Sequence, residues 1–551
     1  MRRITDKIYP HIIPDLKQWP IYQFALHKAE YKKELVEIVF NDLIKKYGDD
    51  IKDEISKCAY LELKRIKLQP WKVDPPEEQK FWLAIRKELL ESDACDDKEY
   101  CYFQLKRIIN RYIEEIFGDF KVSTFKLARI VLAYFFNRLF NGFFTGMIFN
   151  PHKHKSLKDK ILLAGYIEEV RDLFKKGVVI FLPTHQSNLD SIMLGFTIDY
   201  KLGLPAFAYG AGLNLFNYEI AAYYMSRLGA YKVDRRKKNS IYFNTLLNYS
   251  KYSILKGVNT IFFPGGTRSR SGKIETELKT GLMSSLVDAQ YEMLNLSEKR
   301  KIFVVPVIMN YHSVLEAKPL IYSFLKKKGK KKFLPKARYR DKIFKLMGTL
   351  KLIYRIFTKK SSFVLSLGKP MDVMGNAVDA QGNSIANTGA IVKVEDYYKR
   401  EGELVYDAQR NLVYTKMLAK KVAKSYLRYN VVFCSHLVAY SAFKAFMEKL
   451  EANTVFDLMK YQEKNQSIEF DDMKAHVEKT LAVLLQREKE GKIILTDELK
   501  LETEEVIKRG IKKLGVFHDV DVLYKDKKNN IKTGDFGLLY YYANRLSFLD
   551  K

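Results

Sequence analysis

Residues 177–199 carry the clearest pattern of hydrophobic and polar positions in the chain. An apolar, β-branched run at 178–182 predicts a buried strand, and after a short break apolar residues recur at the spacing of a helix. His185 and Asp190 therefore lie where a strand gives way to a helix. In α/β enzymes, ligands bind outside the carboxyl ends of the strands, where helix amide groups favour negative charge. The pattern thus marks this turn as a candidate for chemistry.

Short apolar runs continue downstream and predict the fold class. Amphipathic stretches suited to helices separate most of these runs, which is typical of an α/β fold. The further strand-like runs lie at 205–209, 230–233, 258–263, 302–308 and 363–367. We expect an α/β catalytic domain over residues 155–376, with a mixed or mainly parallel sheet flanked by helices.

The chain on either side of this domain has a helical pattern. A chain of 551 residues is too long for one hydrophobic core, so two or three domains are expected. Charged and apolar residues alternate at helical spacing in the first part of the chain and predict a helical N-terminal domain over 1–120. Residues 377–395 are rich in turn-forming residues and predict a linker, and residues 396–551 predict a mostly helical C-terminal region.

Residues 121–154 are unusually apolar and aromatic. The stretch 125–149 is nearly long enough to cross a bilayer, but polar residues interrupt it, including Arg129 and Arg138. One interpretation is a membrane-docking segment that dips into one leaflet, with aromatic rings at the depth of the headgroups. The other is a buried helix that packs against the next domain.

The charge of the chain points to an anionic partner. Lysine and arginine exceed aspartate and glutamate by 95 − 65 = 30, and nucleic acid, acidic lipid or a phosphorylated substrate would each fit such a charge. Basic and apolar residues alternate at 326–360. Anionic headgroups attract each such charge by about 1 kcal/mol, so this segment favours a membrane surface. Nucleic acid or an acidic carrier protein could bind the same segment.

The cysteines and the first residues bear on the cellular compartment. The four cysteines lack the paired spacing of a metal site and predict reduced thiols; they are Cys58, Cys95, Cys101 and Cys434. Residues 1–20 lack the continuous apolar core of a secretory signal. We therefore expect the protein on the cytoplasmic side. Together with the basic segment, this predicts peripheral or monotopic attachment at the cytoplasmic face of the cell membrane. We expect neither a metal nor a bound cofactor.

The types of residue at the central turn favour acid–base chemistry. A neutral imidazole accepts a proton at physiological pH, and a carboxylate can hold its tautomer and stabilise the imidazolium that forms. His185 and Asp190 are five positions apart and are not helical neighbours, but a turn could bring their side chains together. On spacing alone, the alternative is that Asp190 belongs to the first turn of the helix and His185 is an unrelated loop residue.

Four sequence motifs, in a fixed order along the chain, favour a catalytic pair over two unrelated residues. The sequence HQSNLD at 185–190 is followed by GAYKVDR at 229–235, FFPGGTRSRSGK at 262–273 and VVPVIMNYHSVLE at 304–316. Together they resemble the four blocks of the glycerolipid acyltransferase superfamily, whose first block is HxxxxD. The arginine-rich third block, followed by a Lys-Thr-Gly triplet at 279–281, most resembles the glycerol-3-phosphate acyltransferase branch.

The resemblance implies a set of site residues. His185 would be the general base and Asp190 its orienting carboxylate. The substrate-binding positions it implies are Arg235, Gly266, Thr267, Arg268, Ser269, Arg270, Lys279, Pro306 and Tyr311. The arginines suit a phosphate because a guanidinium offers rigid bidentate donors. One position departs from the superfamily pattern FPEGTRS, because Gly265 stands where glutamate is usual.

The resemblance also implies a function. It predicts a membrane-associated enzyme that moves a fatty acyl group from a thioester, acyl-CoA or acyl carrier protein, to the sn-1 hydroxyl of glycerol 3-phosphate in phospholipid biosynthesis. One alternative keeps the chemistry and takes 1-acylglycerol 3-phosphate as the acceptor. The alternative from another class is a basic nucleic-acid-binding protein with an inert α/β domain, which leaves the four ordered blocks unexplained and makes nucleic acid an unlikely partner.

Overall fold

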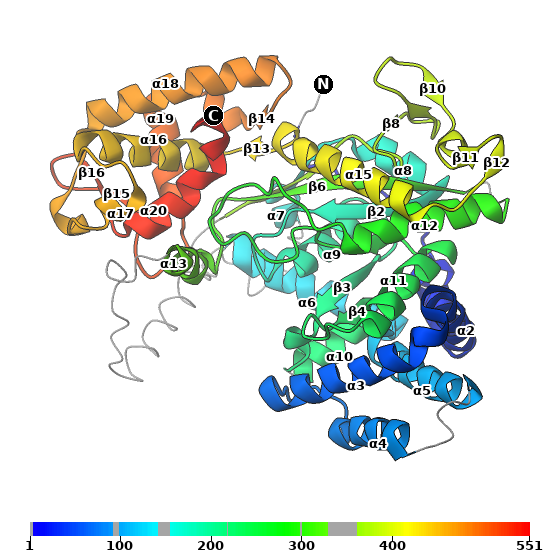
Figure 1. Ribbon diagram of the computed structural model, residues 1–551. Coiled ribbons are helices and arrows are strands. Elements are labelled where there is room, and N and C mark those ends of the chain that lie inside the picture. Colours follow the sequence, from blue (N-terminus) through cyan, green and yellow to red (C-terminus); the bar gives the residue numbers. More distant parts are fainter. Residues whose placement is uncertain are drawn as a thin grey trace.

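The centre of the molecule is a seven-stranded sheet. The computed structural model describes residues 4–91, 98–141, 155–217, 219–297, 300–328 and 361–550 (Figure 1). The strands lie in the order β1-β7-β6-β2-β5-β3-β4. Neighbouring strands are parallel except for β6 and β7, which are antiparallel. Their bounds are β1 Ile161–Gly165, β2 Gly177–Pro183, β3 Ala208–Gly212, β4 Ala230–Val233, β5 Thr260–Ile261, β6 Lys301–Tyr311 and β7 Phe363–Leu367.

Helices cover both faces of this sheet and explain its apolar strands. In β2, Val179 and Phe181 pack on one face, whereas Val178, Ile180 and Leu182 pack on the other. A strand buried on both faces appears in the sequence as a continuous apolar run. The helices between the strands are α8 Ile167–Phe174, α9 Asp190–Tyr200, α10 Glu219–Arg227, α11 Ser240–Leu255 and α12 Gly281–Asn295. The predicted α/β class is confirmed.

The N-terminal helices pack against the β3–β4 side of the sheet and against α11 (Figure 1). Their shared core contains Trp82 and Tyr112 from these helices together with Tyr231 and Tyr249 from the sheet domain. The helices are α1 Pro20–Leu26, α2 Lys28–Tyr47, α3 Ile51–Leu68, α4 Glu78–Glu91 and α5 Lys98–Ile116. The N-terminal region is therefore helical, as predicted, and shares its core with the sheet domain.

Helix α6 (Val122–Asn141) combines features of both interpretations of the apolar segment. Its inner face packs into the core of the sheet domain through Phe136, Leu139 and Phe140, and Arg129 binds Asp199 of α9 at 2.6 and 2.8 Å. Its outer face exposes large apolar side chains, namely Leu127, Ile130, Val131, Tyr134 and Phe135. Residues 142–154 of the predicted docking segment lie outside the described residues. Among the described helices, none is both long enough and apolar enough to cross a bilayer.

The C-terminal region is mostly helical, as predicted, and α16 to α20 lie together to one side of the sheet domain (Figure 1). Helix α15 (Ala408–Arg428) packs on α12 and β6, whereas α16 and its neighbours form a separate core. The helices of that core are α13 Ala317–Lys327, α16 Cys434–Lys449, α17 Val455–Leu458, α18 Phe470–Lys489, α19 Thr503–Lys513 and α20 Phe536–Ala543. The chain then continues in a short 3-10 helix, η10 Asn544–Asp550.

Short elements complete the described fold. The predicted linker, 377–395, contains a small antiparallel sheet of β8 Ala377–Val378, β9 Ser384–Ile385 and β10 Ile391–Val392. Besides short 3-10 helices, the remaining short elements are α7 Lys155–Lys158, β11 Lys399–Arg400, β12 Glu403–Leu404, β13 Val431–Val432, β14 Ile494–Leu495, β15 Leu523–Lys525 and β16 Ile531–Thr533. Most of the basic segment predicted at 326–360 lies outside the described residues.

Candidate active site

The turn between β2 and α9 brings His185 and Asp190 together. Imidazole Nδ1 of His185 lies 2.9 Å from Oδ2 of Asp190. The same carboxylate oxygen accepts hydrogen bonds from the backbone N–H groups of Gln186 at 2.6 Å and Ser187 at 2.9 Å. The Tyr311 hydroxyl, at the end of β6, donates to the other oxygen at 2.8 Å. The buried carboxylate of Asp190 thus accepts hydrogen bonds from the His185 ring, from two backbone amides of the turn and from Tyr311, and these contacts hold the turn in place.

This arrangement assigns the two ring nitrogens of His185. A carboxylate that already accepts from two amides and a hydroxyl is an acceptor, so Nδ1 of His185 donates its proton to Asp190. The other nitrogen, Nε2, is then free to accept a proton in the neutral ring. The side chain of His185 is 21% exposed and lines a cavity, whereas that of Asp190 is fully buried. Only the histidine can therefore meet a substrate.

The loop after β5 holds the backbone of His185. The His185 N–H donates to the carboxyl oxygens of Glu275 at 3.2 and 3.4 Å, and the Ser269 N–H donates to the His185 carbonyl at 2.7 Å. The ring of Phe263 lies against the imidazole, with centroids 4.4 Å apart. The histidine is thus held through its side chain, its N–H and its carbonyl.

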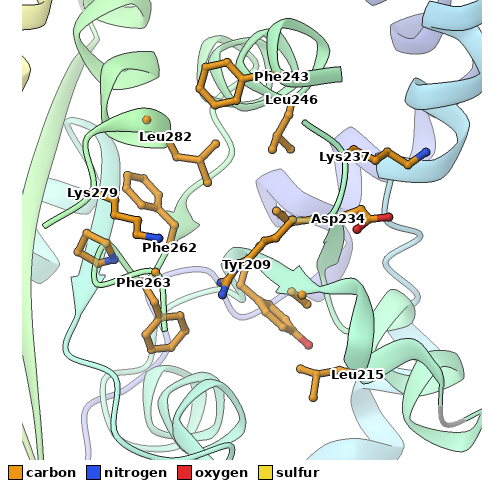
Figure 2. A pocket seen from close by; sticks show the side chains of 18 of the residues that line it. Tyr209, Leu215, Asp234, Lys237, Phe243, Leu246, Phe262, Phe263, Lys279 and Leu282 are labelled. Atoms are coloured by element: carbon orange, nitrogen blue, oxygen red, sulfur yellow. The ribbon is translucent and has the colours of Figure 1, made fainter. Parts of the chain in front are cut away.

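A cavity of about 460 Å³ opens beside His185. Aromatic and aliphatic side chains form much of its wall, including Tyr209, Phe243, Leu246, Phe262 and Leu282 (Figure 2). Basic side chains from two loops also line it: Arg235 and Lys238 follow β4, and Lys279 precedes α12. The cavity therefore joins the candidate base to both an apolar wall and a cationic one.

The basic run after β4 divides into paired and unpaired residues. Arg236 binds Asp234 at 2.7 Å and also Asp74, which precedes α4. The Lys237 ammonium is buried and lies 2.7 Å from Glu115, 3.5 Å from Glu78 and 3.9 Å from Glu62. Figure 2 shows Lys237 turned away from Lys279 on the opposite side of the cavity. The charges of these two cations are therefore balanced by carboxylates.

Arg235 and Lys238, by contrast, are exposed. Within the described part of the chain, no carboxylate forms an ion pair with either side chain. Although its surface is exposed, partial desolvation by the surrounding cavity wall lowers the pKa of the Arg235 guanidinium, and the arginine remains charged. An arginine without a carboxylate partner on a cavity wall is a ready binding group for an anion.

The other predicted binding residues are placed differently. Gly266 and Lys279 line the cavity with Arg235, whereas four residues of the same loop are not among its lining residues, namely Thr267, Arg268, Ser269 and Arg270. Arg268 lies 3.6 Å from the carboxylate of Glu316. That carboxylate also accepts from the Ser187 hydroxyl at 2.8 Å and the Asn188 N–H at 3.0 Å. Arg268 and Glu316 therefore support the His185 turn from outside.

The two residues predicted on β6 lie behind the site. Pro306 is buried within the strand, and neither it nor Tyr311 is among the residues that line the cavity. Tyr311 instead contacts Asp190 through its hydroxyl. It therefore supports the carboxylate of Asp190 and does not line the cavity.

The structure adds two charged residues that the sequence did not single out. Glu275 contacts the backbone of His185, and burial raises the pKa of its carboxyl to about 8. Arg545, from η10, is buried and donates to the Asn310 side chain at 2.9 Å; burial lowers its pKa to about 10. No local pattern marks either residue, because the residues that each one contacts are distant in the sequence.

Possible metal ligands and the cysteines were also located in the structure. Within the described residues, no group of three or more His, Cys, Asp or Glu side chains is arranged to hold a metal ion. Cys58, Cys101 and Cys434 are buried free cysteines. Cys95 lies outside the described residues.

Comparisons with known proteins identify the domain around this cavity. Residues 166–310 match the family model described as Acyltransferase. Curated relatives named glycerol-3-phosphate acyltransferase include those from Baumannia cicadellinicola (28% identical), Pseudomonas paraeruginosa (24%) and Alteromonas mediterranea (26%). The matches cover 45–47% of this chain but only 27–29% of those relatives. Residues 166–310 are therefore an acyltransferase domain, and the names of the relatives support its place in the glycerolipid acyltransferase superfamily.

Proposed function

We propose that this protein is an O-acyltransferase that moves a fatty acyl group from an acyl thioester to the sn-1 hydroxyl of glycerol 3-phosphate. The observation that carries the proposal is one cavity that is lined by both His185, oriented by Asp190, and the unpaired Arg235. A base for a hydroxyl and a cation for a phosphate are the two groups that this acceptor requires. The names of the relatives support the same acceptor.

In the proposed reaction, Nε2 of His185 takes the proton of the acceptor hydroxyl as its oxygen attacks the thioester carbonyl. The tetrahedral intermediate collapses with cleavage of the carbon–sulfur bond, and the leaving thiolate takes the proton from the imidazolium. Asp190 stabilises that imidazolium through the 2.9 Å contact with Nδ1. The acyl group passes directly to the acceptor, and the thioester, acyl-CoA or acyl carrier protein, is a co-substrate and not a bound cofactor.

The cavity wall suggests how the acceptor and the acyl chain are arranged. Arg235, Lys238 and Lys279 would hold the phosphate, so that the hydroxyl lies beside the imidazole. Arg268 and Arg270 remain further candidates from the resemblance, although they are not among the lining residues. The aromatic and aliphatic side chains around Phe243 and Phe262 would receive the acyl chain or the thioester arm.

We also propose that the enzyme works at the surface of an anionic membrane. Helix α6 presents a row of exposed apolar side chains, among them Ile130 and Tyr134. A net charge of +30 adds electrostatic attraction to acidic headgroups. Peripheral attachment of this kind would bring the cavity to its lipid product, at the cytoplasmic face of the membrane.

The test is acyl transfer by the purified protein in vesicles that contain anionic lipid. Acyl-CoA and acyl carrier protein serve in turn as donors, and glycerol 3-phosphate and its 1-acyl derivative as acceptors. We expect the wild-type protein to form product from glycerol 3-phosphate and His185→Ala to form none. The control is His476→Ala, which replaces a partly exposed histidine of α18 and should leave product formation unchanged. If product formed only from the 1-acyl derivative, the acceptor would be 1-acylglycerol 3-phosphate and not glycerol 3-phosphate. Absence of transfer, with thermal stabilisation by nucleic acid, would favour the nucleic-acid-binding alternative.

A further inference from the structure

The backbone at position 265 does not favour glycine, but the Glu275 side chain occupies the space beside it. The neighbouring Gly266 has φ +73°, a value that favours glycine, whereas Gly265 is not among the residues with positive φ. A Cβ atom built on Gly265 would lie 2.5 Å from Oε1 and 3.0 Å from Cδ of Glu275. Another side chain at 265 would therefore enter the space that the Glu275 carboxyl fills.

Glu275 uses that space to contact the backbone of the candidate base. Its two carboxyl oxygens accept from the His185 N–H at 3.2 and 3.4 Å. The loop that carries Glu275 has no regular secondary structure, but backbone hydrogen bonds hold it on either side of Glu275. Ser269 N–H donates to the His185 carbonyl at 2.7 Å, and Lys279 N–H donates to the Pro264 carbonyl at 2.8 Å.

The C-terminal segment holds the middle of the same loop. The Asn544 side chain donates to the Ser271 carbonyl at 2.8 Å. A Cβ atom on Gly272 would lie 2.0 Å from the carbonyl oxygen of Tyr541, so the two backbones are in close contact. The position of Glu275 is therefore set by packing on both sides of the loop.

We propose that Glu275 is a positioning residue for His185, and that its carboxyl takes the place of a side chain at position 265. This inference rests on the proposed role of His185 as the base. Where the superfamily pattern has glutamate at this position of the block, this chain has glycine at 265 and delivers a carboxyl from 275. The glycine at 265 leaves the space that the Glu275 carboxyl fills, so we expect the effects of substitutions at these two positions to depend on each other.

The physical role of Glu275 follows from the anchors of His185. Asp190 fixes the ring, Ser269 fixes the carbonyl and Glu275 fixes the N–H. Without the third anchor, the turn can shift and carry the imidazole away from the acceptor hydroxyl. Displacements of about 1 Å at a reacting group can lower a rate by about a hundredfold. The loss should appear in kcat and not in the affinity for the acceptor, because Glu275 does not line the cavity.

The decisive experiment compares single and paired variants in the acyl transfer assay. We expect Glu275→Ala to lower kcat by about tenfold or more, with the KM for glycerol 3-phosphate within about twofold of wild type. Glu275→Gln keeps an oxygen that can accept from the His185 N–H and should retain most of kcat. Gly265→Glu alone should also lose activity, because its side chain meets Glu275. The pair Gly265→Glu with Glu275→Ala should recover kcat above both single variants.

A matched control and an independent readout complete the test. Glu277→Ala changes an exposed glutamate in the same loop and should behave as wild type. Hydrogen exchange of the His185 amide reports the proposed contact without any acyl transfer, and it should accelerate in Glu275→Ala but not in Glu277→Ala. A wild-type protein without transfer activity would overturn the proposed function while amide exchange still tests the contact. Wild-type kcat and amide protection in Glu275→Ala would overturn the inference, as would a folded double variant no more active than Glu275→Ala.

Discussion

At the scale of single residues, the buried carboxylate of Asp190 is held by four hydrogen-bond donors. Its carboxylate accepts from the His185 ring, two backbone amides and the Tyr311 hydroxyl while fully buried. A neutral amide cannot accept all of these donors, because one of its two ends is itself a donor.

Asp190→Asn should therefore lower both activity and stability. We expect kcat to fall by about a hundredfold or more because the imidazole loses its tautomer and its stabilised cation. The free energy of unfolding should fall by about 1–3 kcal/mol, since buried donors lose their acceptor. Urea denaturation beside the transfer assay would measure both. A variant with full activity would show that the carboxylate does not orient the base.

Glu275 predicts a dependence of stability on pH. Its pKa is raised from 4.5 to about 8, chiefly by burial and also by the charge of Asp190, whereas the hydrogen bond from the His185 N–H and the charge of Arg545 act to lower it. A folded state that holds its proton more tightly than the unfolded chain is stabilised below pH 4.5, and this contribution is lost as the pH rises toward about 8.

Glu275→Gln, which cannot titrate, should therefore lose part of the decline in melting temperature between pH 5 and 9. Melting curves of the variant and wild type across that range provide the measurement, with Glu277→Gln as the exposed control. Parallel curves for Glu275→Gln and wild type would contradict the assigned titration.

At the scale of elements, the loop after β4 shows how one basic run serves two purposes. Carboxylates of the N-terminal helices hold Lys237, and Asp74 and Asp234 hold Arg236. Although burial alone would lower the pKa of Lys237, Glu115, Glu62 and Glu78 raise it. Arg235, between these anchors and β4, is left for the cavity.

Adjacent substitutions should separate these purposes. Arg235→Ala should raise the KM for glycerol 3-phosphate by about tenfold or more, with little change in stability, because the exposed cation proposed to bind the phosphate is lost. Lys237→Met should lower the free energy of unfolding by about 3–5 kcal/mol, because buried carboxylates lose their cation. Kinetics and urea denaturation of both variants test the division. The same effect from both would refute it.

At the scale of the whole molecule, one exposed face and the net charge lead to a prediction about membranes. Tyr134 on α6 is 62% exposed, and Tyr60 on α3 is 60% exposed, so the two tyrosines form a matched pair. Only Tyr134 lies in a row of exposed apolar side chains.

Tyr134→Glu should weaken co-sedimentation with anionic vesicles, because a carboxylate replaces an apolar contact and is repelled by acidic headgroups. Tyr60→Glu should leave binding unchanged. High salt should release much of the wild-type protein if charge dominates the attachment. Equal vesicle binding by both variants would contradict the proposal that α6 contacts the membrane.

The sequence could predict features that depend on neighbouring residues. The run at 178–182 became β2, and the turn after it holds His185 and Asp190 together. The predicted strand at 258–263 was too long: β5 contains only Thr260 and Ile261, because the chain then turns toward the site. The resemblance indicated the family, and the comparisons bear it out.

Local pattern determined the α/β class, the helical flanking regions and the position of the candidate base, because hydrophobic periodicity reflects which face of an element is buried. Only the tertiary structure decided which cations of the 235–238 run are free, since their carboxylate partners come mainly from the distant N-terminal helices. It also decided that a carboxyl from Glu275 fills the space at Gly265. Contacts between residues far apart in the chain leave no periodic signal in either partner, and this is why the sequence left these points open.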